Sequence, residues 1–148
     1  MEDGLQIKEI SSKDTLELRQ KVLRPHQMIE DCVYPGDEDN TTFHLGAFEN
    51  ESLMGIVSVY QRNHETLDGK KGFQIRAMAT VPEARGKGLA KALLECAEKK
   101  VMPNGASYTW ANARTSAWGF YEKLGYQRMN EQCEIKGIGP HYLIYKVI

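Results

Sequence analysis

The 148-residue sequence lacks long hydrophobic runs, and nothing in it approaches the roughly 20 apolar residues that a membrane-spanning helix needs. Its first four residues, Met1 to Gly4, lack the basic and apolar parts of a signal peptide. An excess of positive charge is missing too, because 19 Lys and Arg face 20 Asp and Glu, for a net charge of -1. We therefore expect a cytoplasmic protein whose main partner is neither a nucleic acid nor a membrane.

Cysteine is also scarce, with Cys32, Cys96 and Cys133 in the whole chain. Their odd number and the lack of paired or metal-like spacing argue against a disulfide framework and predict no metal site. Cys96 falls on the apolar face of a predicted helix, so we interpret it as a core residue. Repeats, low-complexity segments and linkers are absent from the sequence, which predicts a single domain over residues 1–148.

What the sequence does contain is the composition of an ordinary globular protein, 41% hydrophobic and 26% charged. Hydrophobic periodicity predicts strands at residues 5–9, 42–48, 53–60, 73–81, 106–111, 127–135 and 142–147, and helices at 16–23, from 89, and at 117–124. Ser11 and Asp14 resemble a capping box for the first helix, Thr115 or Ser116 is expected to cap the last, and Gly125 to end it. This order predicts an α/β fold, a mixed sheet with helices on both faces.

Residues 25–40 form the longest irregular stretch and contain the acidic residues Asp37, Glu38 and Asp39. One interpretation is a solvated acidic loop. The other is a segment that covers a substrate, because long loops inside compact domains are often functional.

A short glycine loop between a strand and a helix is the clearest candidate site. The strand of residues 73–81 ends at Pro82, and Arg85 to Gly88 lead into a helix that begins near Leu89. A helix N-terminus presents unpaired backbone N–H groups, and glycines let a phosphate approach them closely. The loop has neither the Walker spacing nor that of the Rossmann dinucleotide motif. It predicts a phosphate-binding site of another kind.

Two segments of the sequence form recognisable motifs. The glycine loop reads Arg85-x-x-Gly88-x-Ala90, and a later segment reads Ala117-x-x-Phe120-Tyr121-Glu122-Lys123-Leu124-Gly125-Tyr126. They resemble the pyrophosphate motif, Gln/Arg-x-x-Gly-x-Gly/Ala, and the A-x-x-F-Y-x-K-x-G-F/Y helix of the GNAT superfamily of acyl-CoA-dependent N-acyltransferases. The two motifs occur in the expected order, which is more specific than either alone.

Further segments are distinctive: Leu23-Arg24-Pro25, His44-Leu45-Gly46, Arg76-x-Met78-Ala79-Thr80, Asn112-Ala113-Arg114-Thr115-Ser116-Ala117 and Gly139-Pro140-His141. Together they resemble the glyphosate N-acetyltransferases, and this resemblance runs from Ile7 to Lys146. The phosphate loop departs from those enzymes, whose loop is degenerate, and keeps the superfamily form.

The resemblance implies a GNAT fold in which two adjacent parallel strands splay apart in a V. It also implies that acetyl-CoA lies in the opening as co-substrate, with its pyrophosphate on the glycine loop. The implied cofactor-binding residues are Met78, Thr80, Arg85, Gly86, Lys87, Gly88, Leu89, Ala90, Asn112 and Tyr121.

Acetyl transfer needs a base for the amine, donors for the oxyanion and a proton for the departing thiolate. The strand from Phe73 to Met78 has no carboxylate, so the glutamate base of many GNAT enzymes has no counterpart there. The resemblance implies His141 as general base, Tyr121 as acid, and strand backbone near Met78 as the oxyanion donor. Spacing alone favours different interpretations: His141 would be a structural histidine after a Gly-Pro turn, and Tyr121 would be a core aromatic residue.

The resemblance also implies that Arg24, Arg76 and Arg114 line the acceptor site together with His141. Arginines usually lie at the surface or in ion pairs, but guanidinium forks bind carboxylate or phosphonate groups bidentately. We therefore expect an N-acetyltransferase for a small anionic amine of the amino-acid or amino-phosphonate type. Two alternatives stay open: acetylation of peptide or protein amines, and an acyl-CoA-binding sensor without turnover. The sequence fits a monomer and a homodimer equally.

Overall fold

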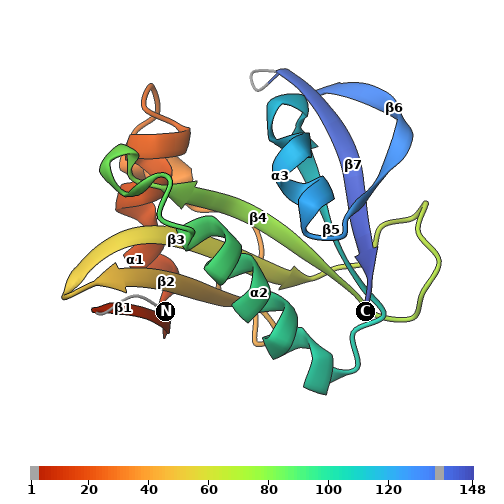
Figure 1. The fold of residues 1–148 in the computed structure, drawn as a ribbon, viewed down its shortest axis with the longest axis horizontal. Coiled ribbons are helices and arrows are strands. Elements are labelled where there is room, and N and C mark those ends of the chain that lie inside the picture. The colour runs from red at the N-terminus through yellow and green to blue at the C-terminus, as the bar shows by residue number, and fades with distance from the viewer. Residues whose placement is uncertain (1–3, 136–138) are drawn as a thin grey trace.

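A computed structural model describes residues 4–135 and 139–148, and its centre is a seven-stranded sheet in the order β1-β2-β3-β4-β5-β7-β6 (Figure 1). The strands are β1 (Leu5–Ile10), β2 (Phe43–Glu49), β3 (Ser52–Gln61), β4 (Gly72–Thr80), β5 (Tyr108–Arg114), β6 (Gln127–Ile135) and β7 (Gly139–Val147). The helices are α1 (Ser12–Leu18), α2 (Leu89–Val101) and α3 (Trp118–Lys123), with a π-helical turn η1 (Arg19–Leu23) and 3-10 turns η2 (Ile29–Cys32), η3 (Pro82–Ala84), η4 (Met102–Asn104) and η5 (Thr115–Ala117). The strands and helices expected from periodicity are all present, with some boundaries shifted.

The sheet opens between β4 and β5. These strands form the one parallel pair among the described strands, and they are hydrogen-bonded only from Gly72↔Tyr108 to Gln74↔Trp110. Beyond Gln74 they diverge, while every other neighbouring pair runs antiparallel (Figure 1). The mixed, mostly antiparallel sheet with a V-shaped splay is therefore confirmed.

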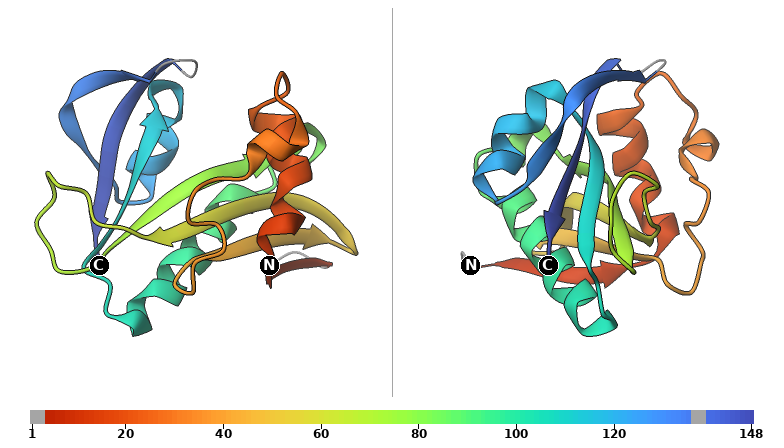
Figure 2. Two further views of the ribbon diagram at one scale, coloured as in Figure 1. Left: turned by 180° about the vertical axis from the view of Figure 1, so that it is seen from behind. Right: turned by 90° about the vertical axis from the view of Figure 1, so that its right-hand side faces the viewer.

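Helices cover both faces of the sheet, as predicted. Figure 2 shows α1 and α2 on opposite faces of the β1–β4 half. Helix α2 buries Leu89, Leu93, Leu94 and Ala97, each at most 2% exposed, because these residues recur on one face at helical spacing. Within the described ranges, no helix is both long and apolar enough to span a membrane.

Helix ends follow some of the local signals and not others. Ser11 forms the predicted capping box at the start of α1. Gly125 has a φ of +94° after α3, as predicted for a residue that ends a helix. In contrast, neither Thr115 nor Ser116 makes an N-cap hydrogen bond, so that prediction is wrong. Strand β5 continues to Arg114, because pairing with β7 extends it past the predicted end at residue 111.

Two predicted loops also differ from expectation. In the 25–40 segment Glu38 and Asp39 are exposed, but Asp37 is 5% exposed, so a uniformly solvated acidic loop is wrong. The turn predicted at 137–140 falls partly outside the described residues, and its last two residues, Gly139 and Pro140, belong to β7.

Candidate active site

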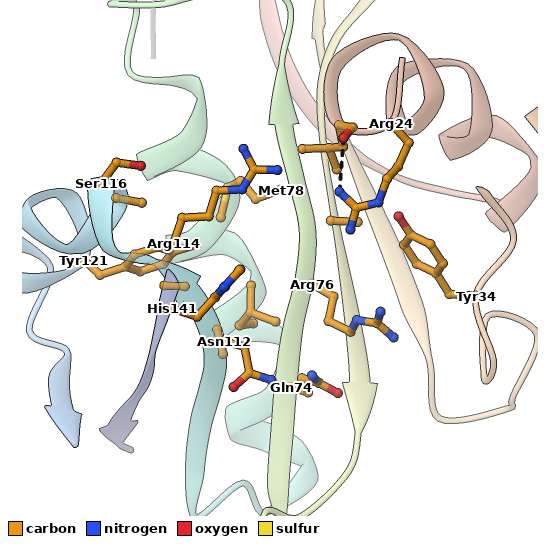
Figure 3. A pocket seen from close by; sticks show the side chains of 16 residues that line it. Arg24, Tyr34, Gln74, Arg76, Met78, Asn112, Arg114, Ser116, Tyr121 and His141 are labelled. Atoms are coloured by element: carbon orange, nitrogen blue, oxygen red, sulfur yellow. Dashed lines mark hydrogen bonds between the residues drawn. The ribbon is translucent and has the colours of Figure 1, made fainter. Parts of the chain in front are cut away.

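A cavity of about 420 Å³ lies in the V between β4 and β5 (Figure 3). Side chains from the η1 end, β4, β5, η5, α3 and β7 line it, together with Tyr34. Seven residues singled out in the sequence are among the lining: Arg24, Arg76, Met78, Asn112, Arg114, Tyr121 and His141. The fold thus brings distant segments of the sequence into one site.

Arg76 projects from β4 on the wall that faces the 25–40 segment. Its guanidinium carbon lies 4.7 Å from the ring centre of Tyr34 and 5.7 Å from that of Tyr60. Such stacking holds a guanidinium in place and leaves its edge N–H groups free to bind an anion. Arg24 lies nearby and donates through Nη1 to the Leu23 carbonyl at 3.0 Å.

The three cavity arginines differ from a typical surface arginine in their charge environment. Among the side chains that the structure describes, those of residues 4–129 and 139–148, no carboxylate oxygen forms a salt bridge with Arg24, Arg76 or Arg114. Guanidinium groups around a cavity that have no such partner leave positive charge for an anionic ligand.

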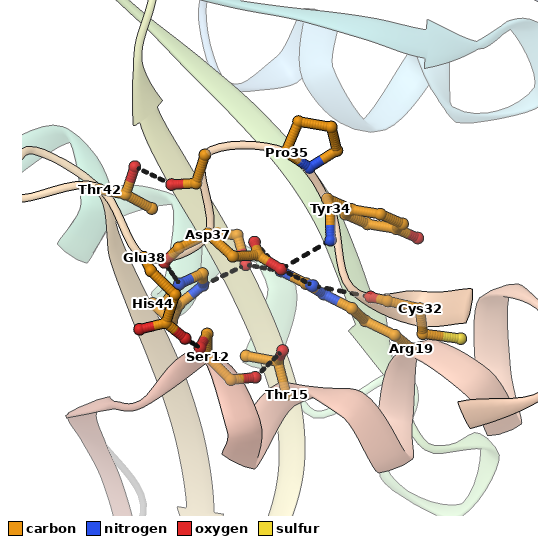
Figure 4. Close-up of polar contacts among 12 residues, drawn as sticks. Ser12, Thr15, Arg19, Cys32, Tyr34, Pro35, Asp37, Glu38, Thr42 and His44 are labelled. Atoms are coloured by element: carbon orange, nitrogen blue, oxygen red, sulfur yellow. Dashed lines mark hydrogen bonds and ion pairs between the residues drawn. The ribbon is translucent and has the colours of Figure 1, made fainter. Parts of the chain in front are cut away.

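A buried ion pair supports the wall that carries Arg76 (Figure 4). Arg19 is fully buried and donates Nη1 to Asp37 Oδ2 at 2.7 Å and Nη2 to Asp37 Oδ1 at 2.9 Å. Tyr34 N–H and Tyr60 O–H also donate to that carboxylate, at 2.8 and 2.5 Å. Burial alone would raise the pKa of Asp37, but the hydrogen bonds from Arg19, Tyr60 and Tyr34 outweigh it and lower the pKa.

The same network contains His44, which the sequence gave no reason to place in the site. Its Nε2–H donates to the Asp37 carbonyl at 3.0 Å, because a carbonyl oxygen can only accept, and Nδ1 then accepts from Ser58 Oγ at 2.7 Å. His44 is 3% exposed and does not line the cavity. It is a structural histidine.

The opposite wall is formed by β5, β7 and α3. Arg114 and His141 face each other across the β5–β7 pair. His141 is 4% exposed, and its Nδ1 lies 2.6 Å from the Gly139 carbonyl oxygen. Because that oxygen can only accept, Nδ1 carries the proton and Nε2 of the neutral ring keeps its lone pair.

Tyr121 on α3 also lines this wall and is 8% exposed. Burial raises the pKa of Tyr121 to about 12, because the phenolate would lose its hydration. The hydroxyl therefore keeps its proton throughout the neutral range.

A β-bulge interrupts β4 immediately after Arg76. Ile56 pairs with Ala79 and Ser58 pairs with Arg76, so Ala77 and Met78 together oppose one residue of β3. Ala77 has a φ of +54°, a left-handed conformation that costs a non-glycine residue energy. Bulges of this kind change the direction of backbone groups next to active sites.

The remaining predicted residues lie outside the cavity lining. Thr80 ends β4, and the loop from Arg85 to Ala90 leads into the N-terminus of α2. Gly86 and Gly88 have φ of +84° and +80°, and a Cβ at either would meet no atom within 4 Å. The loop backbone is therefore open to a ligand. The Lys87 ammonium pairs with Glu49 at 3.0 Å, a partner that the sequence did not reveal.

Comparison with known proteins agrees with these features. The family model described as "Acetyltransferase (GNAT) domain" matches residues 8–141. An uncharacterized N-acetyltransferase of Bacillus subtilis strain 168, YitI, is 38% identical over 144 residues, which cover 97% of each chain.

Solved structures show the same fold at low sequence identity. Escherichia coli ElaA superimposes with a TM-score of 0.77 at 14% identity, over 96% of this chain and 99% of its own. The PaiA N-acetyltransferase of Thermoplasma acidophilum, solved in complex with coenzyme A, gives a TM-score of 0.68 at 16% identity, over 97% and 99% of the two chains.

Proposed function

This chain belongs to the GNAT acetyltransferase family and is an acyltransferase, and from that premise we propose that it acetylates the amine of a small anionic substrate. The substrate class is that of amino acids and amino phosphonates, including glyphosate-like molecules. One observation carries the proposal: three guanidinium groups line a cavity of about 420 Å³, and no described carboxylate pairs with them.

Acetyl-CoA is the co-substrate of this family, and two features of the chain suit it. The open loop from Arg85 to Ala90 offers backbone N–H groups at the α2 N-terminus for the pyrophosphate. Beyond Gln74, the β4 edge that faces the V has no β5 partner, which leaves the backbone near Met78 and Thr80 for the pantetheine amides. Asn112 and Tyr121 line the other side of the opening.

His141 acts as general base in the proposed reaction. The amine nitrogen attacks the thioester carbonyl, a C–N bond forms, and Nε2 of His141 takes the proton that the nitrogen loses. The hydrogen bond from Nδ1 to the Gly139 carbonyl supports this role, because it fixes the tautomer and the ring orientation.

Tyr121 and the β4 bulge complete the transfer. Backbone N–H groups at the bulge near Met78 stabilise the oxyanion, and the C–S bond then breaks. Tyr121 donates a hydrogen bond to the departing sulfur. Its raised pKa, about 12, supports this role because the donor remains protonated.

The acceptor class follows from charge and from size. Arg24, Arg76 and Arg114 favour carboxylate or phosphonate groups over cationic polyamines. The cavity volume favours a small molecule over a folded protein surface. Similarity of the motifs to the glyphosate N-acetyltransferases supports the same class.

A coenzyme A release assay with matched acceptors tests the proposal. Aspartate, asparagine and aspartic diamide have nearly equal size and decreasing negative charge. We expect kcat/KM to fall about 10-fold or more with each anionic group removed, since a charge-assisted pair contributes roughly 1.5–3 kcal/mol. A preference for spermidine or for a peptide N-terminus would overturn the acceptor class. Acetyl-CoA binding without release of coenzyme A from any acceptor would favour a sensor module.

A further inference from the structure

We propose that Gln74 determines acceptor specificity by donating its side-chain amide N–H groups to the anionic end of the acceptor. This inference rests on the proposed function and adds a neutral donor to the arginines.

Gln74 occupies the closed end of the V. It is the last residue of β4 that pairs with β5, opposite Trp110, and the strands separate immediately beyond it. Its side chain lines the cavity, although only 6% of the residue is exposed. Figure 3 shows it at the base of the cavity, on the same strand as Arg76. A ligand that reaches the base of the V meets this amide.

Arg62 determines which end of the amide faces the cavity. Arg62 Nη1 donates to Gln74 Oε1 at 3.0 Å. A guanidinium has donors only, so the atom that faces it must be the carbonyl oxygen, and Nε2 takes the other position. Within the described part of the chain, Nε2 donates to no protein group. The two N–H groups of a nearly buried amide are thus left for a ligand in the cavity.

Arg62 is itself fixed by three contacts, so the amide orientation is stable. Its Nη2 donates to the Pro35 carbonyl at 3.3 Å, and its guanidinium carbon lies 5.3 Å from the Tyr60 ring centre. Its backbone carbonyl accepts from Trp110 Nε1 at 2.7 Å. The contacts join β3, β5 and the 25–40 segment behind Gln74.

The chemistry of the cavity base follows from this orientation. Gln74 and Arg76 are two residues apart on β4 and therefore project to the same face of the strand. An amide N–H pair beside a guanidinium fork matches the several oxygens of one carboxylate or phosphonate group. The cavity-facing end of the amide offers donors only, so it matches an anionic group, which has only acceptors, better than a hydroxyl or amide group, which also carries donors.

Gln74→Glu is the variant with the largest expected effect, because it places a negative charge where we propose that the anionic end of the acceptor lies. A glutamate keeps an oxygen acceptor for Arg62 but replaces the cavity-facing N–H₂ with a second anionic oxygen. If Gln74 binds the acceptor, KM for aspartate rises about 100-fold, KM for acetyl-CoA changes less than about 2-fold, and KM for aspartic diamide changes little.

Two further variants complete the experiment. Gln74→Met removes the donors without adding charge, and KM for aspartate should then rise about 10-fold. Gln61→Glu adds the same charge at an exposed position on β3, outside the cavity, and should leave both KM values near wild type. If the wild type prefers aspartate and Gln74→Met has the same KM for aspartate, this inference is overturned and the proposed function stays intact. A wild type without preference for anionic acceptors would overturn the proposed function itself.

Discussion

The two walls of the cavity are held in place by different kinds of interaction. Behind Arg76 lies a buried polar network in which Arg19 and Asp37 form a bidentate ion pair. The wall that carries His141 and Tyr121 belongs instead to the hydrophobic core. Tyr121 packs with its ring centre 5.4 Å from that of Tyr126, and the core residues Ala111, Ala113, Tyr126 and Ile144 are each at most 6% exposed.

This difference matches the tasks that we propose for the two walls. Recognition of an anion requires a guanidinium in a fixed direction, and the hydrogen bonds to Asp37 fix Tyr34, on which Arg76 stacks. Proton transfer requires groups with controlled ionisation, and burial alone raises the pKa of Tyr121. We therefore expect substitutions of Arg76 to affect acceptor binding and substitutions of His141 or Tyr121 to affect the rate of transfer, while Arg114 is proposed to bind the acceptor from the second wall.

His141→Ala should give the largest effect and tests the wall assigned to chemistry. We expect kcat to fall roughly 10²- to 10⁴-fold, the usual contribution of a positioned base, with much smaller changes in either KM. Steady-state kinetics with the acceptor and with acetyl-CoA varied in turn measures kcat and both KM values. His26→Ala, at an exposed position, serves as the control. Near-full activity in His141→Ala would return this residue to a structural role.

Asp37→Ala tests the polar support of the other wall. It leaves the Arg19 charge buried without a partner, and we expect the free energy of unfolding to fall by about 3–5 kcal/mol at neutral pH. Because the folded pKa of Asp37 is lowered, the pair contributes fully above the unfolded value of about 3.9 and loses its contribution as pH falls through the lower folded value. The difference in the free energy of unfolding between wild type and Asp37→Ala should therefore become smaller below about pH 4.

Denaturant titrations at several pH values measure this effect. Glu9→Ala removes an exposed pair to Lys100 and should cost no more than about 1 kcal/mol. Should Asp37→Ala fail to fold, Asp37→Asn keeps an acceptor for Arg19 and should show a smaller loss in the same direction. Equal stability of wild type and both Asp37 variants at neutral pH would show that the network does not support this wall.

Sequence patterns were sufficient for the fold and for much of the cavity. Periodicity and glycine positions predicted the strands and α2. Two motifs predicted the loop that begins at Arg85 and the helix that carries Tyr121. His141 and the three arginines came from resemblance alone. Their shared cavity depends on the divergence of β4 and β5 after Gln74, which no local pattern specifies.

The polar network and the role of Gln74 could not be predicted, because both depend on partners distant in sequence. Arg19 lies on the helical face of Thr15 and Leu18, and an arginine on that face was the one available signal. Its partner, Asp37, lies in an irregular segment where neither periodicity nor a motif indicates which acidic residue is buried. The hydrogen bond between Arg62 and Gln74 is likewise set by the pairing of β3 with β4.

Arg76→Ala should give a smaller effect than the first two variants and sharpens the contrast between the walls. Each charge-assisted pair to an anion contributes roughly 1.5–3 kcal/mol, so KM for an anionic acceptor should rise about 10- to 100-fold while KM for acetyl-CoA hardly changes. Arg76→Lys should restore little, because an ammonium keeps the charge but loses the planar fork and its stacking on Tyr34.

A matched control is available on β6, the edge strand next to β7. Arg128 also stacks on a tyrosine, with its guanidinium carbon 4.5 Å from the Tyr142 ring centre, but it does not line the cavity. Arg128→Ala removes the same kind of stacked cation, so a general loss of charge or of stacking would change both variants alike. Recognition of the acceptor by Arg76 instead requires that KM for aspartate rise in Arg76→Ala alone. An equal rise in both variants would mean that Arg76 acts through structure or overall charge. It would contradict the proposal that Arg76 recognises the acceptor.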